Sequence, residues 1–200
     1  MPLMTNTLSS AAMTNGALIG IIGLVAILAC WVLAIVLYRV SENGSIGRKL
    51  TILLILEGFV LVTAGFPGFA FNIPFSFYDS LPVLMFLMSM VHHLGDAAML
   101  ALYPPFLAMA LDTSLTRPFA NTRVRIGLAI GSAALSLTVV FTGSPIATTL
   151  LYSLMTLLFI YALVASVHAW RTARRGIVRE RAGIFALAFG MRDLGWSLSY

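Results

Sequence analysis

Long runs of apolar residues alternate with short polar segments along the whole chain. An α-helix needs about 20 mostly apolar residues to cross a bilayer, and most of these runs have that length. The pattern predicts spanning helices at about residues 16–40, 50–71, 82–111, 126–141, 146–170 and 182–200. We therefore expect an all-α protein, a polytopic transmembrane bundle of six helices that forms a single domain over residues 16–200.

The two ends of the chain differ from each other. Residues 1–15 are polar and contain no lysine or arginine, whereas a cleaved signal peptide would begin with a basic segment. We expect a short tail there that lies outside the cytoplasm. At the other end the sequence stops at Tyr200 without a polar tail, and two interpretations stay open. Either the protein finishes there, or the sequence is cut short of a seventh helix.

The basic residues are distributed unevenly between the connecting segments. The segments after the first, third and fifth runs hold 3, 3 and 5 lysines and arginines, which is 11 of the 12 in the chain. Short loops rich in lysine and arginine stay on the cytoplasmic side of a membrane. The asymmetry predicts a plasma-membrane protein with an extracytoplasmic N-terminus and arginine-rich loops in the cytoplasm.

Composition supports the bilayer as the main partner. The chain is 60% hydrophobic and 10% charged, against about 25% charged residues in a typical soluble domain. The net charge of +5 does not indicate nucleic-acid binding, because the arginines lie in short loops where anionic lipid head groups are the natural contacts. The single cysteine, Cys30, excludes an intramolecular disulfide and a cysteine-based metal site.

A few ionisable residues lie inside the predicted spans, where each charge costs roughly 3 kcal/mol on insertion scales. The rise of the helices places them at overlapping depths, so we expect a buried polar cluster that binds a ligand, relays protons or holds the bundle together. Its members are Glu57, His92, His93, Asp96, Arg192 and Asp193.

The spacing of these residues leaves two interpretations open. His92 and Asp96 are four residues apart and share a helix face, whereas His93 points about a quarter-turn away. In a structural clamp, Arg192 would pair with Asp96 or Glu57, and Asp193 would take a histidine proton or a second donor. In a functional pocket, a histidine beside a carboxylate would titrate near neutral pH.

Cofactor and enzyme chemistry find little support in the sequence. The third histidine, His168, lies roughly 20 Å from His93 along the bundle by the helical rise, so one chain cannot supply a bis-histidine haem site. We expect at best two usable ligands from His92, His93 and Asp96, and hence no metal site. No nucleophile elbow or nucleotide-binding fingerprint occurs, and Lys49, the sole lysine, lies in a loop where it cannot hold retinal. We expect no catalytic residue, no metal and no cofactor.

Three segments resemble a known class of membrane protein. They are Leu54-x-x-Glu57-Gly58, Leu102-Tyr-Pro-Pro-Phe106, and the stretch from Arg179-x-Arg181 to Arg192-Asp193. With the basic loop after each odd helix, they make the chain similar in topology, over most of its length, to the N-out, seven-helix membrane modules of prokaryotic sensory proteins. The resemblance implies a sensory role, in which a seventh helix and a cytoplasmic signalling domain would follow the residues of this sequence.

Three functional hypotheses follow. The first is a non-enzymatic integral membrane protein, either a sensor-like module or an accessory subunit that assembles with other membrane subunits or with copies of itself. The second is a small proton-coupled transporter in which Asp96, His92 and Glu57 titrate. The third is an intramembrane redox or metal-dependent enzyme subunit that uses His92 and His93.

Overall fold

The structure, a computed structural model, describes residues 3–64, 80–173 and 176–198 together with residues 68, 70, 71 and 73. Side chains are described within these ranges from residue 17 to residue 190, Phe189 excepted. The described residues contain no strand, which confirms the all-α class. Their six long helices are α1 (Leu3–Val40), α2 (Ile46–Thr63), α5 (Pro82–Leu111), α6 (Thr122–Thr142), α7 (Pro145–Thr172) and α8 (Ile177–Leu198), with a short 3₁₀ turn η1 (Arg117–Ala120).

Four of these helices are long and apolar enough to cross a membrane. Their candidate spans are Ala17–Val40, Pro82–Leu111, Thr122–Thr142 and Pro145–Thr172, and each coincides with a run that we expected to span. The 18 residues of α2 include three charged side chains, Arg48, Lys49 and Glu57, which is more than any of these four spans contains. A membrane-spanning role for α2 and α8 stays a prediction.

Polar caps explain why several helices begin earlier than their apolar runs. The side chains of Ser45, Asn121 and Ser144 each accept a hydrogen bond from a backbone N–H two or three residues ahead. Such caps satisfy backbone donors that have no partner within the helix. The first turns of α2 and α6 are polar but helical, so these helices start about four residues before our expected starts at 50 and 126.

Other boundaries differ for separate reasons. The helix α1 begins at Leu3, although we expected a tail over residues 1–15, and only its part from Ala17 onward forms the candidate span. The helix α2 ends at Thr63, before the expected end at 71, and most of residues 65–79 lie outside the described residues. The bounds of α5 are those expected, because Pro82 fits the first turn of a helix and Asp112 ends it in a left-handed conformation.

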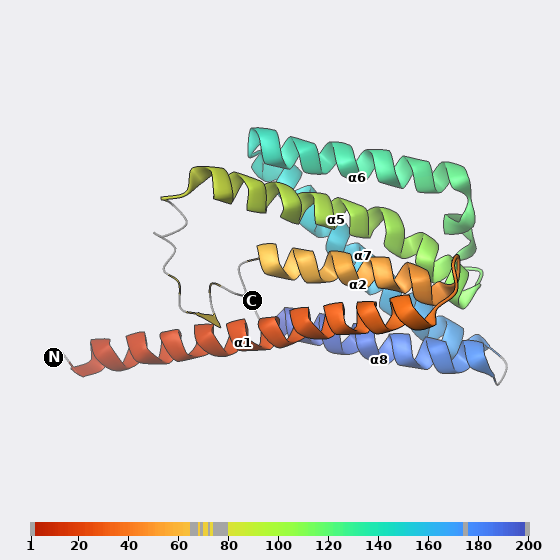
Figure 1. The fold of residues 1–200 in the computed structure, drawn as a ribbon. Coiled ribbons are helices and arrows are strands. Elements are labelled where there is room, and N and C mark those ends of the chain that lie inside the picture. Colours follow the sequence, from red (N-terminus) through yellow and green to blue (C-terminus); the bar gives the residue numbers. More distant parts are fainter. Residues whose placement is uncertain are drawn as a thin grey trace.

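The helix α5 is the centre of the bundle (Figure 1). It packs against α2, α6, α7 and α8, whereas α1 contacts only α2 among the described elements. The buried apolar core lies mainly between α5 and α7, where Ala162, Ala165 and Ala169 have no exposed surface and allow close packing. Large apolar side chains cover the outside of α1, α6 and α7, as expected for helices that face lipid.

The three basic connections lie at one end of the bundle. Figure 1 shows the α1–α2, α5–α6 and α7–α8 connections together at that end, with the N-terminus at the opposite end. The fold therefore gathers Lys49 and most of the loop arginines on one side, as alternating membrane crossings require.

Candidate functional site

Three donor atoms converge on one face of α5. The Nε2 atom of His92 lies 3.7 Å from Oδ2 of Asp96, and the Nδ1 atom of His93 lies 3.8 Å from the same oxygen. One donor atom from each of the three residues lies within 4.8 Å of the other two. Our expectation of at most two usable ligands stays a prediction, although each of the three residues places a donor atom in this group. Helical side chains lean toward the N-terminus, so the carboxylate at position 96 lies over the turn that holds both histidines.

Two of these donor atoms are buried without a hydrogen-bond partner. His93 is 9% exposed and Asp96 is 3% exposed. Nδ1 of His93 and Oδ2 of Asp96 find no hydrogen-bond partner among the described residues. Leaving a buried polar atom unsatisfied costs about 1–3 kcal/mol, and more for a charged group. Both atoms therefore remain able to accept a further partner.

The helix α2 orients the third donor. Nδ1 of His92 lies 3.4 Å from the carbonyl oxygen of Val60 and 3.3 Å from Oγ1 of Thr63. The Thr63 hydroxyl donates its own proton to backbone carbonyls of α2, so it accepts from His92. Both partners can accept a proton from Nδ1, and in the tautomer that carries this proton the Nε2 lone pair is free for a metal. Histidines that bind metals are commonly fixed by such a bond from the other ring nitrogen.

The helix α6 holds the opposite side of the site. The buried Ser136 hydroxyl donates to the carbonyl of His93 at 2.7 Å, and the buried Ser132 hydroxyl donates to the carbonyl of Ala97 at 3.0 Å. These two bonds lie on either side of Asp96 along α5. On α7, the ring of Tyr152 lies 6.3 Å from the ring of His93. The site is therefore enclosed by α2, α6 and α7.

A glycine allows α2 to approach the site closely. A β-carbon on Gly95 would lie 2.5 Å from Cγ2 of Val60, which is closer than real β-carbons come to other atoms. Because position 95 has no side chain, the Val60 carbonyl comes within reach of His92. The residue beside Asp96 therefore helps to set the geometry of the site.

The other members of the expected cluster have different positions. Glu57 lies on α2 and is not part of the group of three. Arg192 and Asp193 lie on α8, but their side chains are outside those the structure describes. Among the described side chains, the structure thus brings together His92, His93 and Asp96.

Sequence reasoning missed the residues that support this site. Thr63 and Ser136 are polar residues within apolar runs, a signal that could have drawn attention to them. The Val60 carbonyl could not have been found, because nothing in a sequence marks which backbone oxygen will face a neighbouring helix. The support of the site therefore depends on tertiary packing.

Two imidazoles and one carboxylate form a donor set typical of a transition-metal site. Zinc binds histidine nitrogen at about 2.0–2.1 Å and carboxylate oxygen at about 2.0–2.2 Å, often with three protein ligands. Two ligands of a tetrahedral ion at these lengths lie about 3.4 Å apart. The two histidine–carboxylate separations of 3.7 and 3.8 Å are close to that value, and all three donor atoms lie within 4.8 Å of one another.

No protein-family model matches the chain, and no curated protein or solved structure is significantly similar to it.

Proposed function

We propose that this chain is a non-enzymatic, sensor-like membrane protein in which His92, His93 and Asp96 bind a divalent transition-metal ion, zinc above all. This proposal takes the place of our expectation that the chain binds no metal. The observation behind it is that His93 and Asp96 direct buried, unpartnered donor atoms toward the oriented ring nitrogen of His92.

The donor set decides which cation fits. Imidazole nitrogen suits zinc and its transition-metal neighbours, whereas magnesium and calcium prefer oxygen ligands. The group contains no thiolate, the ligand that favours copper(I). Zinc accepts three protein ligands and a fourth position for water or another group. A His₂Asp set on one helix face meets that requirement.

A bound dication would also compensate the buried carboxylate. Asp96 lies within the candidate span Pro82–Leu111, and a charge at such a depth is costly unless it is paired. Neither histidine forms a close hydrogen bond with it, since both separations exceed 3.5 Å. A divalent cation between the three atoms would replace these long contacts with short metal–ligand bonds.

Hydrogen bonds link the three-residue group to the neighbouring helices, so metal binding can be transmitted to these helices. His92 is linked to α2 through Val60 and Thr63, and the backbone of His93 is linked to α6 through Ser136. Drawing the two imidazoles and the carboxylate onto one ion would pull on these hydrogen bonds, and we propose that α5 shifts relative to both neighbours in response. A ligand that binds one helix arrangement better than another shifts the population toward it. This coupling supports a sensor-like role over a purely structural site.

We further propose that all six helices span the plasma membrane with the basic connections in the cytoplasm. Support comes from the charge asymmetry of the sequence and from the position of the three basic connections at one end of the fold (Figure 1). The accessory-subunit, transporter and redox-subunit alternatives stay predictions from the sequence.

Zinc titration of the purified protein tests the proposal. In detergent, zinc at about 100 times its Kd should stabilise the fold by about 2.7 kcal/mol, seen as a rise in Tm. His93→Ala should abolish this rise. His168→Ala is the matched control, because His168 lies on α7 outside the three-residue group, and it should leave the rise intact. Equal loss in both variants, or no rise in the wild type, would contradict the proposal.

The sensor-like role has its own test. Spin labels at Asn43 and Arg123, in a Cys30→Ser background, report the distance between the α1–α2 connection and the start of α6. Both positions are exposed, so the labels do not disturb the core. Zinc should change the distance distribution, and Asp96→Asn should remove the change. Zinc binding with an unchanged distribution would favour a structural metal site.

A further inference from the structure

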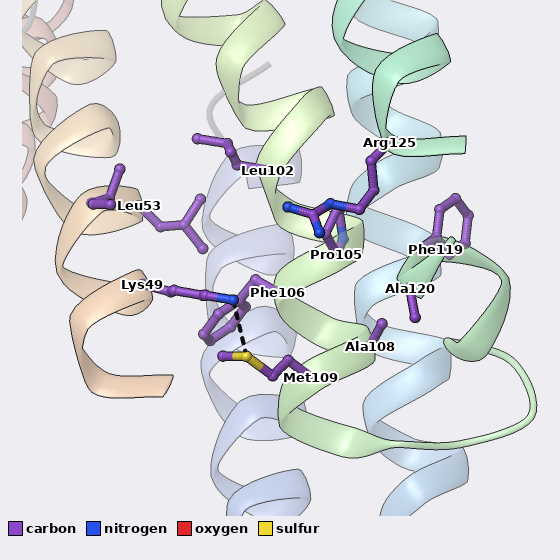
Figure 2. A pocket seen from close by; sticks show the side chains of 11 residues that line it. Lys49, Leu53, Leu102, Pro105, Phe106, Ala108, Met109, Phe119, Ala120 and Arg125 are labelled. Atoms are coloured by element: carbon purple, nitrogen blue, oxygen red, sulfur yellow. Dashed lines mark hydrogen bonds between the residues drawn. The ribbon is translucent and has the colours of Figure 1, made fainter. Parts of the chain in front are cut away.

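A second site lies at the basic end of the bundle. A cavity of about 400 Å³ is enclosed by α2, α5, η1 and α6, far along α5 from the histidines. Figure 2 shows Lys49 and Arg125 reaching toward α5 from opposite sides of this cavity. Apolar side chains, among them Leu53, Leu102 and Phe106, form much of the remaining wall.

Among the described residues, neither cation of this cavity has an anionic partner. No acidic side chain belongs to the cavity lining that the structure describes. The ammonium group of Lys49 donates to the thioether sulfur of Met109 at 3.1 Å, and a thioether is a weak acceptor. The guanidinium group of Arg125 has no hydrogen bond or ion pair within the part of the chain that the structure describes. Both groups are therefore available to an anion.

Neighbouring arginines at the same end differ in this respect. Arg117 forms an ion pair with Asp112 at 3.2 Å. Arg48 donates to the carbonyl of Tyr38 at 2.7 Å, and its guanidinium lies over the Tyr38 ring. The fold thus provides partners for these two cations from its own chain, while Lys49 and Arg125 face a shared cavity.

We propose that this cavity holds the phosphate group of an anionic phospholipid. Arginine and lysine are the usual phosphate-binding side chains, and basic pockets between membrane helices bind lipid head groups. The cavity lies where the candidate span of α5 ends and that of α6 begins, which is the level of the head groups. Exposed apolar side chains of Ile52 and Leu102 beside it provide a surface for an acyl chain. This apolar surface favours a lipid over free phosphate.

The single lysine makes a direct test practical. Lys49 is the only lysine in the chain, so acylation of its amine can be followed by peptide mass spectrometry. The protein is placed in nanodiscs of phosphatidylcholine, with or without phosphatidylglycerol. The anionic lipid should slow acylation of Lys49 about fivefold, the factor expected for one close phosphate contact.

Matched variants separate a specific site from general surface charge. Arg125→Gln should remove most of the protection, whereas Arg123→Gln, which lies in the same first turn and outside the cavity, should keep it. Arg125→Lys should retain the protection because it keeps the positive charge. This variant shows whether the loss in Arg125→Gln comes from the missing charge rather than from misfolding. Equal behaviour of the two glutamine variants would overturn the proposal. Protection by millimolar inorganic phosphate in pure phosphatidylcholine would also overturn it, since free phosphate would then be the ligand.

Discussion

Two regions along α5 contain polar groups that have no partner of opposite charge among the described residues. Within the described part of the chain, buried donor atoms around Asp96 have no cation beside them, and the cations Lys49 and Arg125 around Pro105 have no anionic partner. Nine residues separate Asp96 from Pro105, which is about 13 Å along a helix. The chain does not bring these opposite charges together, although both regions belong to its best-packed helix. We infer that each region is completed from outside, one by a metal ion and the other by a lipid.

The two regions also differ in how they are held. The histidine site is fixed by interhelical hydrogen bonds through Thr63 and Ser136, and its members are mostly buried. Lys49 and Arg125 are exposed, and Lys49 has only a thioether as its hydrogen-bond partner. A preorganised site loses affinity when its supports are altered, whereas a flexible cationic site depends mainly on charge. The following predictions use that difference.

The largest effect is expected from Asp96→Asn. This substitution keeps the shape of the side chain but removes the charged ligand, so zinc affinity measured by calorimetry should fall by more than about 100-fold. Lipid protection of Lys49 should not change. The matched control is Asp112→Asn, an exposed carboxylate just beyond the end of the same helix, which should bind zinc as the wild type does. Comparable loss in both variants would mean that zinc responds to net charge alone.

The second effect concerns the approach of α2 to the site. The added methyl group of Gly95→Ala would collide with Val60, so we expect a loss of about 1–3 kcal/mol in the free energy of unfolding and weaker zinc binding. Gly131→Ala on α6 is the control, because a β-carbon there meets nothing within 4 Å. It should be neutral or slightly stabilising. The free energy of unfolding and the zinc affinity should therefore differ between the two variants. Equal values for Gly95→Ala and Gly131→Ala would contradict the role of Gly95.

A smaller effect should follow the loss of one interhelical hydrogen bond. Ser136→Ala removes the donor to the His93 carbonyl and should cost about 1 kcal/mol of stability. Zinc affinity should fall several-fold, since the backbone of His93 loses its link to α6. Ser153→Ala removes only an exposed bond within α7 and serves as the control. Unchanged zinc binding in Ser136→Ala would show that α6 does not position the site.

The smallest effect is expected at the cationic cavity. Met109→Leu conserves volume and removes only the weak acceptor of Lys49, so stability should change by less than about 1.5 kcal/mol. Lipid protection of Lys49 should remain, and so should zinc binding. If the substitution removed lipid protection, Met109 rather than a phosphate would be the important partner of Lys49.

The comparison also shows how far sequence reasoning could go. The bounds of α5 follow from Pro82 and from the apolar run to Leu111, because both signals are local. The pairing of His92 with Asp96 also follows from helical spacing. The approach of His93 to Asp96 was missed because a quarter-turn between Cα positions says little about where side-chain atoms meet. Because helical side chains tilt toward the N-terminus of the helix, Nδ1 of His93 lies near the same Asp96 oxygen as His92.

The cationic cavity could not be found from the sequence. Lys49 and Arg125 lie 76 positions apart, near the starts of α2 and α6, and in the sequence each resembles an ordinary topology signal. Only the packing of α2 and α6 on opposite sides of α5 brings them to one cavity. The predicted pairing of Arg192 with Asp96 or Glu57 stays a prediction, because it depends on side chains outside those described.

X-ray absorption at the zinc edge of the purified, zinc-loaded protein tests the central proposal most directly. We expect one zinc ion per chain, with a first shell of nitrogen and oxygen at about 2.0–2.1 Å and the scattering pattern of two imidazoles. Sulfur at about 2.3 Å, a single imidazole, or failure to retain one zinc ion per chain would contradict a site formed by His92, His93 and Asp96.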